Sequence, residues 1–488
     1  MKNNKAKAFI LSSFAILALV SCGGSPVVSS NEESKLPAME EAEASSIKEK
    51  LVIEGGDSVI GNLYLPNEVD GATITWKSDK PEVISDTRIG KAEPGVVTRG
   101  EEDISVTLTA NIEKDGKGAS YSQTLKVLQA PKAIGEDDYE GYLFAHFIGE
   151  GQAGGEQIFF ALAQDGLNFK DTNNSQPVLT SDVGEKGVRD PYIYRSPEGD
   201  RFFIIATDLC IYNRGGWKTN SQGYTEASVS GSESLVLWQS SDLIHWGEPT
   251  LLPVAPERAG MAWAPEMTFD QSSGEYVIYF SSCIMDEANV MKEKGDAVYS
   301  VHTRDFKHFS DTKLFIDNQS DPDGKARNII DATLIKIGDY YYSATKDGDN
   351  NENNGGIRIM RTQDLSGTPT WEKVMNLEDT GLKISSFKGE TAPTNKNLEG
   401  PEFFQLNKKD WANPEVPEYC LMADQYQNGA GYLPFLTTDI EDRTNANNSW
   451  KMMQSGEYSF DRLTKRHGGI LRLTQEEVSR VKEAFLPE

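Results

Sequence analysis

The chain has 488 residues, with 75 acidic against 48 basic side chains and a formal net charge of −27 at pH 7. Such a charge repels phosphate backbones and anionic headgroups, so no nucleic acid partner is expected, whereas a neutral sugar is indifferent to it. Four cysteines and five histidines argue against a disulfide framework and give a zinc site little to build from.

The N-terminal residues 1–22, MKNNKAKAFILSSFAILALVSC, combine lysines, a short apolar run and small residues before a cysteine. This order is typical of a signal peptide, and the apolar run is short for a membrane span. The ending LVSC resembles the lipobox of bacterial lipoproteins. The resemblance implies a lipid anchor on Cys22, which would place the protein on the bacterial outer membrane, at the cell surface or the periplasmic face. An ordinary secretory signal with a chance cysteine is the alternative.

Residues 23–47 are polar, acidic and nearly free of aromatic side chains. A segment of this composition cannot bury enough apolar surface to fold by itself. We therefore expect a flexible tether between the anchor and the folded part of the chain.

Residues 48–131 are expected to form a small β-sandwich. Stretches such as ATITWKS and ISVTLTANI alternate apolar and polar residues with period two, and turn residues separate them. The ITWKSDKPEVIS and VTLTA stretches resemble bacterial immunoglobulin-like domains, with Trp76 as the expected core residue. No cluster of reactive side chains occurs here, so we interpret the domain as a spacer.

Residues 139–488 contain an internal repeat. A segment of apolar strand, aspartate and a following aromatic residue occurs five times, and hairpins of another kind lie between the copies. One hairpin plus one repeat makes a four-stranded sheet, and radial stacking of such sheets buries both faces of each. The repeat aspartates are Asp165, Asp242, Asp305, Asp364 and Asp439.

The sequence therefore predicts an all-β fold, a five-bladed β-propeller preceded by a small immunoglobulin-like β-sandwich. The hairpins are one short of five. The strands in YLFAHFIG and RHGGILRL, from the two ends of the domain, would supply the missing pair and close the ring. The TQEEVSRVKEAF stretch predicts a terminal helix, with Thr474 and Glu477 as its capping box.

Each of the four hairpins begins with an acidic residue, in VRDPYI, WAPEMT, IIDATL and LEGPEF. In a propeller the innermost strand of each blade lines a central channel, so we expect these residues to share one point of the repeat and to face one funnel. Glycoside hydrolysis needs one protonated and one ionised carboxyl, and crowding raises the pKa of one acid above the others. The four acids are Asp190, Glu266, Asp331 and Glu399.

The ordered set of strand starts resembles glycoside hydrolase family 43, whose members share a five-bladed β-propeller. The resemblance implies an inverting, exo-acting glycosidase that needs no cofactor and acts on an oligo- or polysaccharide. It implies Asp190 as the general base, Glu399 as the general acid and Asp331 as the acid that orients and tunes the proton donor. The expected sugar is α-L-arabinofuranosyl, with β-xylosyl and β-galactosyl next.

Two departures from the family pattern leave one assignment open. IIDAT lacks the proline often found after this aspartate, and the second blade has Glu266 where aspartate is common. The roles of Glu266 and Asp331 could therefore be exchanged, or Glu266 could contact the sugar without taking part in catalysis.

Three further residues are candidates for substrate binding. Trp263, beside Glu266, could stack on a sugar face, with core packing as the alternative. Trp217 lies in a long loop after the first hairpin. His467 is expected in the channel, where related arabinan-cleaving enzymes carry a histidine near a central calcium, so a structural Ca²⁺ is one expectation and an ordinary buried histidine the other. A non-catalytic glycan-binding lipoprotein is the alternative function.

Overall fold

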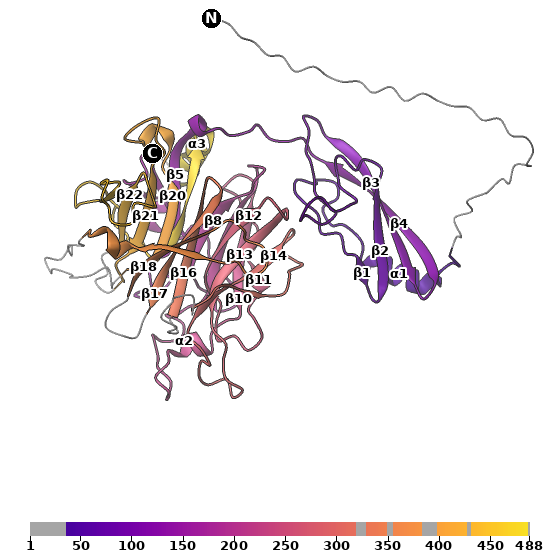
Figure 1. The fold of residues 1–488 in the computed structure, drawn as a ribbon, viewed down its shortest axis with the longest axis horizontal. Helices are drawn as coiled ribbons and strands as arrows, with labels where there is room; N and C mark the ends of the chain where they lie inside the picture. Colours follow the sequence, from indigo (N-terminus) through magenta and orange to yellow (C-terminus); the bar gives the residue numbers. More distant parts are fainter. Residues whose placement is uncertain (1–35, 319–327, 349–354, 383–397, 427–430, 487–488) are drawn as a thin grey trace, which may run out of the picture.

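The computed structural model describes residues 36–318, 328–348, 355–382, 398–426 and 431–486. The expected signal peptide and its Cys22 lie outside these residues. Figure 1 shows two β-rich parts joined by an extended linker that runs past the C-terminal helix. Among the described residues, no helix is long and apolar enough to cross a membrane.

The N-terminal part is built on one antiparallel sheet with the strand order β1-β2-β3-β4. Strand β2 has the burial alternation that its sequence predicts, with every second side chain buried. Trp76 lies in the core, as predicted, and its ring nitrogen donates to the Pro66 carbonyl at 2.9 Å. The strands are β1 (Glu68–Val69), β2 (Ala72–Ser78), β3 (Ile104–Lys114) and β4 (Lys117–Val127).

The tether expected over residues 23–47 does not extend to its predicted end. A helix, α1 (Glu41–Glu49), covers the sheet, and its Ala44 and Ile47 are buried in the same core as Trp76. The sequence did not predict this short amphipathic helix, because its few apolar residues alternate with charged ones in a segment whose overall composition is polar.

The C-terminal part contains five four-stranded antiparallel sheets in the described part of the chain. Their inner strands, β8, β12, β16, β20 and β24, contact one another in sequence, and β24 returns to β8. This closed ring confirms the predicted five-bladed propeller. The first two blades consist of β8 (Val188–Arg195), β9 (Phe202–Asp208), β10 (Ser234–Ser240) and β11 (Thr250–Pro253), and of β12 (Trp263–Asp270), β13 (Glu275–Ser282), β14 (Ala297–Thr303) and β15 (Lys313–Ile316).

The fifth blade joins the two ends of the propeller, as the sequence predicts. Its inner strand β24 pairs with β5, in register from Gly468 opposite His146 to Leu473 opposite Gly141. The remaining blades consist of β16 (Asn328–Ile337), β17 (Tyr340–Gly348), β18 (Gly355–Thr362) and β19 (Glu372–Asn376), of β20 (Glu399–Gln405), β21 (Tyr419–Asp424), β22 (Tyr432–Thr437) and β23 (Trp450–Met452), and of β24 (Gly468–Thr474), β5 (Tyr139–His146), β6 (Phe159–Ala163) and β7 (Lys170–Asp171).

The five repeat aspartates shape equivalent turns between the outer two strands of the blades. Each accepts a hydrogen bond from the backbone N–H two residues further on, at 2.9 to 3.0 Å. An aspartate that bonds its own backbone in this way stabilises a tight turn. The repeat seen in the sequence is thus a repeat of turn chemistry.

Two short helices complete the propeller. Helix α2 (Glu226–Val229) lies in the loop between β9 and β10. Helix α3 (Gln475–Phe485) follows β24, begins with the predicted capping box of Thr474 and Glu477, and packs Val478 and Val481 on the core between the first and fifth blades.

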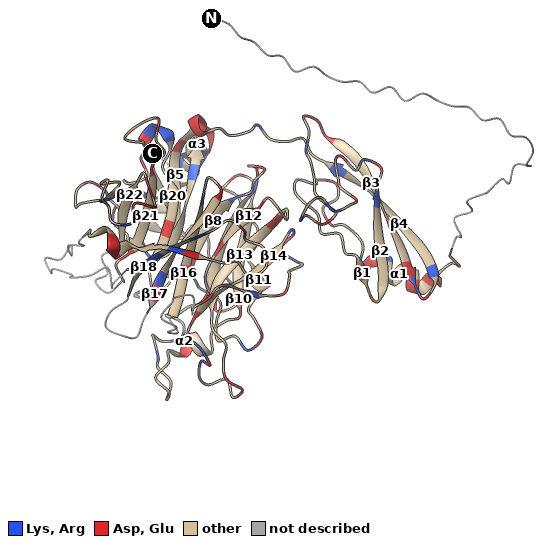
Figure 2. Cartoon of the chain, viewed as in Figure 1, with Lys and Arg blue, Asp and Glu red and all other residues tan. Residues whose placement is uncertain are grey.

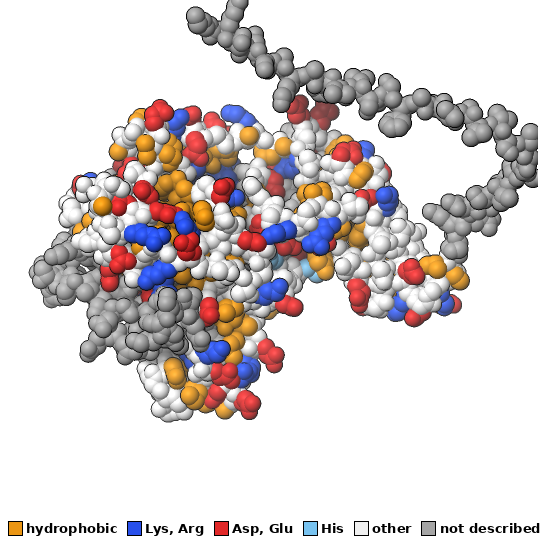
Figure 3. Space-filling model, in the orientation of Figure 1, with side chains coloured by type: hydrophobic (Ala, Val, Ile, Leu, Met, Phe, Trp, Pro, Cys, Tyr) orange, Lys and Arg blue, Asp and Glu red, His pale blue; other side chains and the backbone are white. Residues whose placement is uncertain are grey.

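The two parts of the chain meet through polar contacts. Arg304 of the propeller donates to the carbonyls of Leu63, Glu93 and Pro94, and Arg99 forms an ion pair with Asp200 at 2.8 Å. Charges of both signs are interspersed over the two parts (Figure 2). The space-filling view shows the two parts in contact at this junction (Figure 3). The immunoglobulin-like domain is therefore docked on the propeller.

Candidate active site

Four inner strands begin with the same backbone irregularity. The pairing of β8, β12, β16 and β20 with the next strand shifts register within the first few residues. At each shift one residue has a positive φ, which is costly for residues other than glycine and is typical of functional sites. These residues are Asp190, Ala264, Asp331 and Gly400, with φ of 50°, 46°, 55° and 50°.

The shifts correct the expectation that the four predicted acids share one point of the repeat. Asp190 and Asp331 occupy the positive-φ position, and Glu399 immediately precedes it. Glu266 lies two residues beyond Ala264 and therefore corresponds to Glu402 of the fourth blade. The carboxyls form two layers along the channel, one at the strand starts and one deeper.

Asp190 is held by two neighbours. Its Oδ2 accepts a hydrogen bond from the Thr207 hydroxyl at 2.9 Å, and its Oδ1 lies 3.5 Å from Nδ1 of His467. Burial opposes ionisation, but the hydrogen bond and charge of His467, followed by the charge of Arg189, hold the pKa of Asp190 below its usual value. Asp190 is thus an ionised carboxylate at neutral pH.

Asp331 is more deeply buried than Asp190 and is fixed through its main chain and side chain. Its N–H donates to the Ser281 hydroxyl at 3.0 Å, and its Oδ2 accepts from the N–H of Gly400 at 3.1 Å. Burial raises the pKa of Asp331, as do the carboxylates of Glu399 and Asp190, against the opposing charges of His467 and Lys346. Asp331 therefore links the third blade to the residue that follows Glu399.

Glu399 is engaged on both oxygens by cations. Lys346 Nζ lies 2.7 Å from Oε2, and Nη2 of Arg466 lies 3.1 Å from Oε1. Arg466 also contacts Asp424 through Nε at 2.5 Å, and Asp424 is the cross-strand partner of Glu399. Burial disfavours the lysine charge, but the carboxylates of Glu399 and Asp331 raise the pKa of Lys346 to about 12.

The deeper layer contains two buried glutamates. Glu266 accepts from the Tyr279 hydroxyl at 2.7 Å, and Glu402 accepts from the N–H of Ile470 at 2.8 Å. Burial and then the neighbouring Glu402 carboxyl raise the pKa of Glu266 well above its usual value, and burial raises the pKa of Glu402 to about 8. The Glu402 carboxyl thus disfavours ionisation of Glu266. Asp331, by contrast, lies with Asp190 and Glu399 around His467.

Glu402 was missed by the sequence analysis although the sequence carries a signal for it. Both WAPEMT and LEGPEF contain Pro-Glu, and the equivalent register shifts bring these two glutamates to the same depth.

His467 enters the channel, as predicted, and lies among the carboxyls of the first layer. Its ring packs so closely on Gly400 that a Cβ there would lie 2.6 Å from Cγ of the histidine. Burial disfavours the charged ring, but the carboxylates of Asp190, Asp331 and Glu399 raise the pKa of His467 to about 9. Calcium takes six to eight oxygen ligands, and the described residues include no group of three or more His, Cys, Asp or Glu side chains placed to hold a metal ion. The surroundings of His467 therefore do not fit a calcium ion.

Trp217 and Trp263 lie against each other beside the first blade. Trp217 is 48% exposed, its ring is 6.4 Å from that of Trp263, and its Nε1 donates to Glu150 at 2.8 Å. The guanidinium of Arg189, the neighbour of Asp190, lies 5.2 Å above the Trp217 ring. Trp263 packs on a small apolar cluster, so of the two tryptophans Trp217 presents the larger aromatic surface to solvent.

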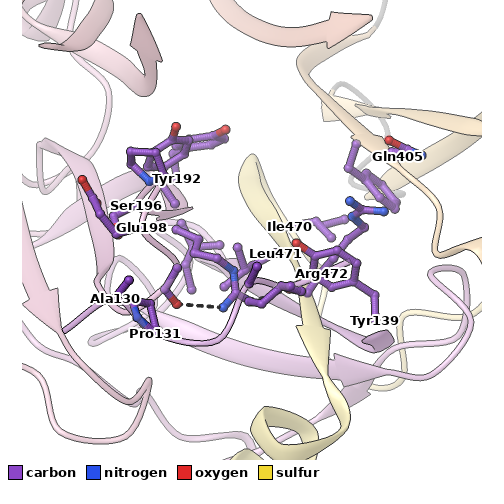
Figure 4. Close-up of a pocket in the computed structure, with 18 of the residues that line it drawn as sticks. Ala130, Pro131, Tyr139, Tyr192, Ser196, Glu198, Gln405, Ile470, Leu471 and Arg472 are labelled. Atoms are coloured by element: carbon purple, nitrogen blue, oxygen red, sulfur yellow. Dashed lines mark hydrogen bonds between the residues drawn. The ribbon is translucent and has the colours of Figure 1, made fainter. Parts of the chain in front are cut away.

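A cavity of about 620 Å³ lies away from these carboxyls. It is formed where the linker from the immunoglobulin-like domain crosses the far ends of the inner strands, with Pro131, Tyr139, Glu198 and Arg472 among its walls (Figure 4). None of the first-layer acids lines it. The cavity belongs to the junction between the two domains.

Two family models match the chain. Residues 137–479 match one described as a probable glycosyl hydrolase domain, related to glycoside hydrolase family 43. Residues 44–130 match one described as an atrophied bacterial Ig domain. The first match covers the propeller, and the second covers the N-terminal sheet together with most of α1.

An alpha-L-arabinofuranosidase of Bifidobacterium longum is 31% identical over 411 residues, which are 76% of this chain and 36% of the relative. The chain thus spans about a third of the length of this relative. Among solved structures, an alpha-L-arabinofuranosidase from Lactobacillus brevis has 15% identity and a TM-score of 0.35, with 57% of this chain and 74% of that chain covered. An endo-1,4-beta-xylanase from Bacteroides thetaiotaomicron has 13% identity and a TM-score of 0.39, with 65% and 96% covered.

Proposed function

Because the chain belongs to the family of probable glycosyl hydrolase domains related to glycoside hydrolase family 43, we propose that it is an inverting, exo-acting glycosidase of oligo- or polysaccharides. One observation carries the proposal: three carboxyls from three different blades, Asp190, Asp331 and Glu399, gather around a single charged histidine. Acids arranged in this way can be held in different protonation states.

Asp190 is the proposed general base. His467 keeps it ionised, so it can take a proton from a water molecule as the water oxygen attacks the anomeric carbon. Attack from the face opposite the leaving group inverts the configuration, and the water needs room between base and sugar. The hydrogen bond from Thr207 fixes the carboxylate that performs this step.

Glu399 is the proposed general acid, which gives its proton to the glycosidic oxygen as the bond to the anomeric carbon breaks. Both its oxygens contact cations when no sugar is bound. A carboxylate paired with two cations carries no proton, so Glu399 must take one up from water as the substrate displaces one of these contacts. The uncharged hydroxyl groups of a sugar can replace a cation as hydrogen-bond partners. Asp331, which is bonded to the N–H of Gly400, orients the start of β20, which carries the donor.

The proposed substrate carries non-reducing-end α-L-arabinofuranosyl groups, as in plant-type polysaccharides. The name of the Bifidobacterium longum relative supports this sugar. β-Xylosyl and β-galactosyl groups are the next candidates, because the shape of the sugar pocket decides among them and a small change in that shape shifts the preference.

A panel of nitrophenyl glycosides tests the function directly. The purified protein should release nitrophenol from the α-L-arabinofuranoside, and proton NMR should show β-L-arabinofuranose as the first-formed anomer. First formation of the α-anomer would contradict inversion. Binding of an arabino-oligosaccharide without turnover on the arabinoside, xyloside or galactoside would instead assign the protein to the glycan-binding class.

We propose further that Cys22 carries a lipid that anchors the enzyme to the outer membrane. The lipobox-like LVSC and the apolar run before it support this. Radiolabelled palmitate should be incorporated into the full chain expressed in a Gram-negative host and not into Cys22→Ala. Equal labelling of the two proteins would contradict the anchor.

A further inference from the structure

Three consecutive basic residues, Lys465, Arg466 and His467, immediately precede the strand that closes the propeller. We call them the closing tripeptide. Strand β24, the inner strand of the fifth blade, contacts both β8 and β20, so the tripeptide lies on the fifth blade between the fourth and first blades. These are the blades that carry Glu399 and Asp190.

Each residue of the closing tripeptide pairs with a different set of carboxylates. His467 contacts Asp190 of the first blade. Arg466 contacts Glu399 and Asp424 of the fourth. Lys465 forms an ion pair with Asp171 of β7, the outermost strand of the fifth blade. The proposed base and the proposed acid are thus held by adjacent residues of one short segment.

The pair of Lys465 and Asp171 is buried more completely than the other two. Both side chains have no exposed surface. Asp171 Oδ2 also accepts the N–H groups of Arg462 and Leu463, at 3.3 and 3.1 Å. One carboxylate therefore fixes both the backbone that leads into the closing tripeptide and its first side chain.

Phe147 holds the middle of the segment. Its carbonyl accepts the N–H of Arg466 at 3.1 Å. Its ring lies between two guanidiniums, 5.7 Å from that of Arg466 and 4.6 Å from that of Arg189. Because Arg189 is the neighbour of Asp190, this aromatic ring bridges the two sides of the site.

We propose that the closing tripeptide is a positioning device that sets the distance between Asp190 and Glu399, with the buried Lys465 to Asp171 pair as its anchor. Lys465 acts through Arg466 and His467 and does not touch the substrate. The inference rests on the proposed function for its effect on catalysis, whereas the position of His467 is testable without activity.

The test removes the anchor without leaving a buried charge. Replacing one partner of a buried pair leaves the other uncompensated, but neutralising both is often tolerated. The double variant Lys465→Met, Asp171→Asn does this and keeps an acceptor oxygen for the N–H groups of Arg462 and Leu463. The matched control is Lys292→Met, Asp296→Asn, which neutralises a similar lysine and aspartate pair in the second blade.

Two readouts apply to variants that melt as cooperatively as the wild type. A displacement of about 1 Å between reacting groups costs about a hundredfold in rate, so we expect kcat of the anchor variant to fall by about ten- to a hundredfold with KM changed less than about threefold. The control should keep the wild-type kcat. An unchanged kcat in the folded anchor variant would overturn the proposal.

The second readout is the NMR titration of His467, whose signal is identified by its absence in His467→Gln. Five histidines in the chain make this spectrum simple. The carboxylates of Asp190, Asp331 and Glu399 surround the ring, and Lys346 pairs with Glu399, so a displaced tripeptide should move the midpoint of the His467 titration away from about 9. If the wild type hydrolyses nothing, the proposed function fails, but a moved midpoint still supports the positioning role and an unmoved one overturns it.

Discussion

His467 Nδ1 lies 3.5 Å from Oδ1 of Asp190, so the segment that closes the propeller ends against the carboxylate that opens its first inner strand. The contact makes the charge of one residue depend on the other. It raises the pKa of the histidine and lowers that of the aspartate. The segment that closes the ring therefore also supplies the charge that keeps the proposed base ionised.

This contact should make stability fall in mildly alkaline solution. The folded pKa of His467, about 9, lies above its usual 6.5. The stabilisation that the charged ring contributes is therefore fully present below about pH 6.5 and disappears as the pH rises through 9. By linkage, this rise in pKa corresponds to about 3 kcal/mol of unfolding free energy. Urea unfolding at pH 7 and pH 9.5 should show a smaller stability gap between wild type and His467→Gln at the higher pH.

The exposed His245, 87% accessible in its side chain, supplies the matched control. His245→Gln should differ from the wild type by the same small amount at both pH values. A gap for His467→Gln that does not narrow between pH 7 and pH 9.5 would show that the buried histidine carries no charge.

The buried glutamate pair predicts a second pH effect over a lower range. Glu402 has a folded pKa of about 8, against its usual 4.5. The stabilisation that its protonated form contributes is therefore fully present below about pH 4.5 and is lost as the pH rises through 8. Glu402→Gln is neutral and nearly isosteric and removes this loss. Between pH 5 and pH 8.5 the variant should therefore lose less unfolding free energy than the wild type, by a few kcal/mol.

Replacement of the exposed Glu415 by Gln is the control for this measurement and should follow the wild-type curve. Parallel curves for wild type and Glu402→Gln would contradict a raised pKa of Glu402 in the folded state.

Trp217 should matter for binding more than for chemistry. Its exposed ring lies beneath the Arg189 guanidinium and beside Trp263, and a stacked aromatic contact contributes about 0.5–1.5 kcal/mol. Trp217→Ala should raise KM by about three- to tenfold with kcat within about twofold of wild type. Tyr64→Ala, which removes an exposed ring of the immunoglobulin-like domain, should change neither. An unchanged KM in Trp217→Ala would exclude the loop from the sugar site.

The architecture was predictable because it rests on local patterns. Alternation of apolar residues indicated the strands around Trp76, and the spaced aspartates marked one turn in each blade. The pairing of β24 with β5 followed from counting hairpins, since a ring with an unpaired strand would leave an edge open.

The depth of the acids was not predictable from the same patterns. A register shift adds residues on one strand only, and nothing in WAPEMT shows that Glu266 lies deeper than Asp190. The cations on Glu399 come from β17 and from the segment before β24. Contacts between segments so far apart in the chain leave no periodic signal, which is why Lys346 and Arg466 were not among the predicted site residues.

The division of labour between Asp190 and Glu399 is tested most directly by the leaving group. A 2,4-dinitrophenyl group departs without protonation, whereas an alkyl alcohol does not. Glu399→Gln should therefore lose about 10³-fold or more in kcat on an alkyl arabinofuranoside and far less on the dinitrophenyl substrate, while Asp190→Asn should lose about 10³-fold on both. Equal losses for Glu399→Gln on the two substrates would contradict its role as the proton donor.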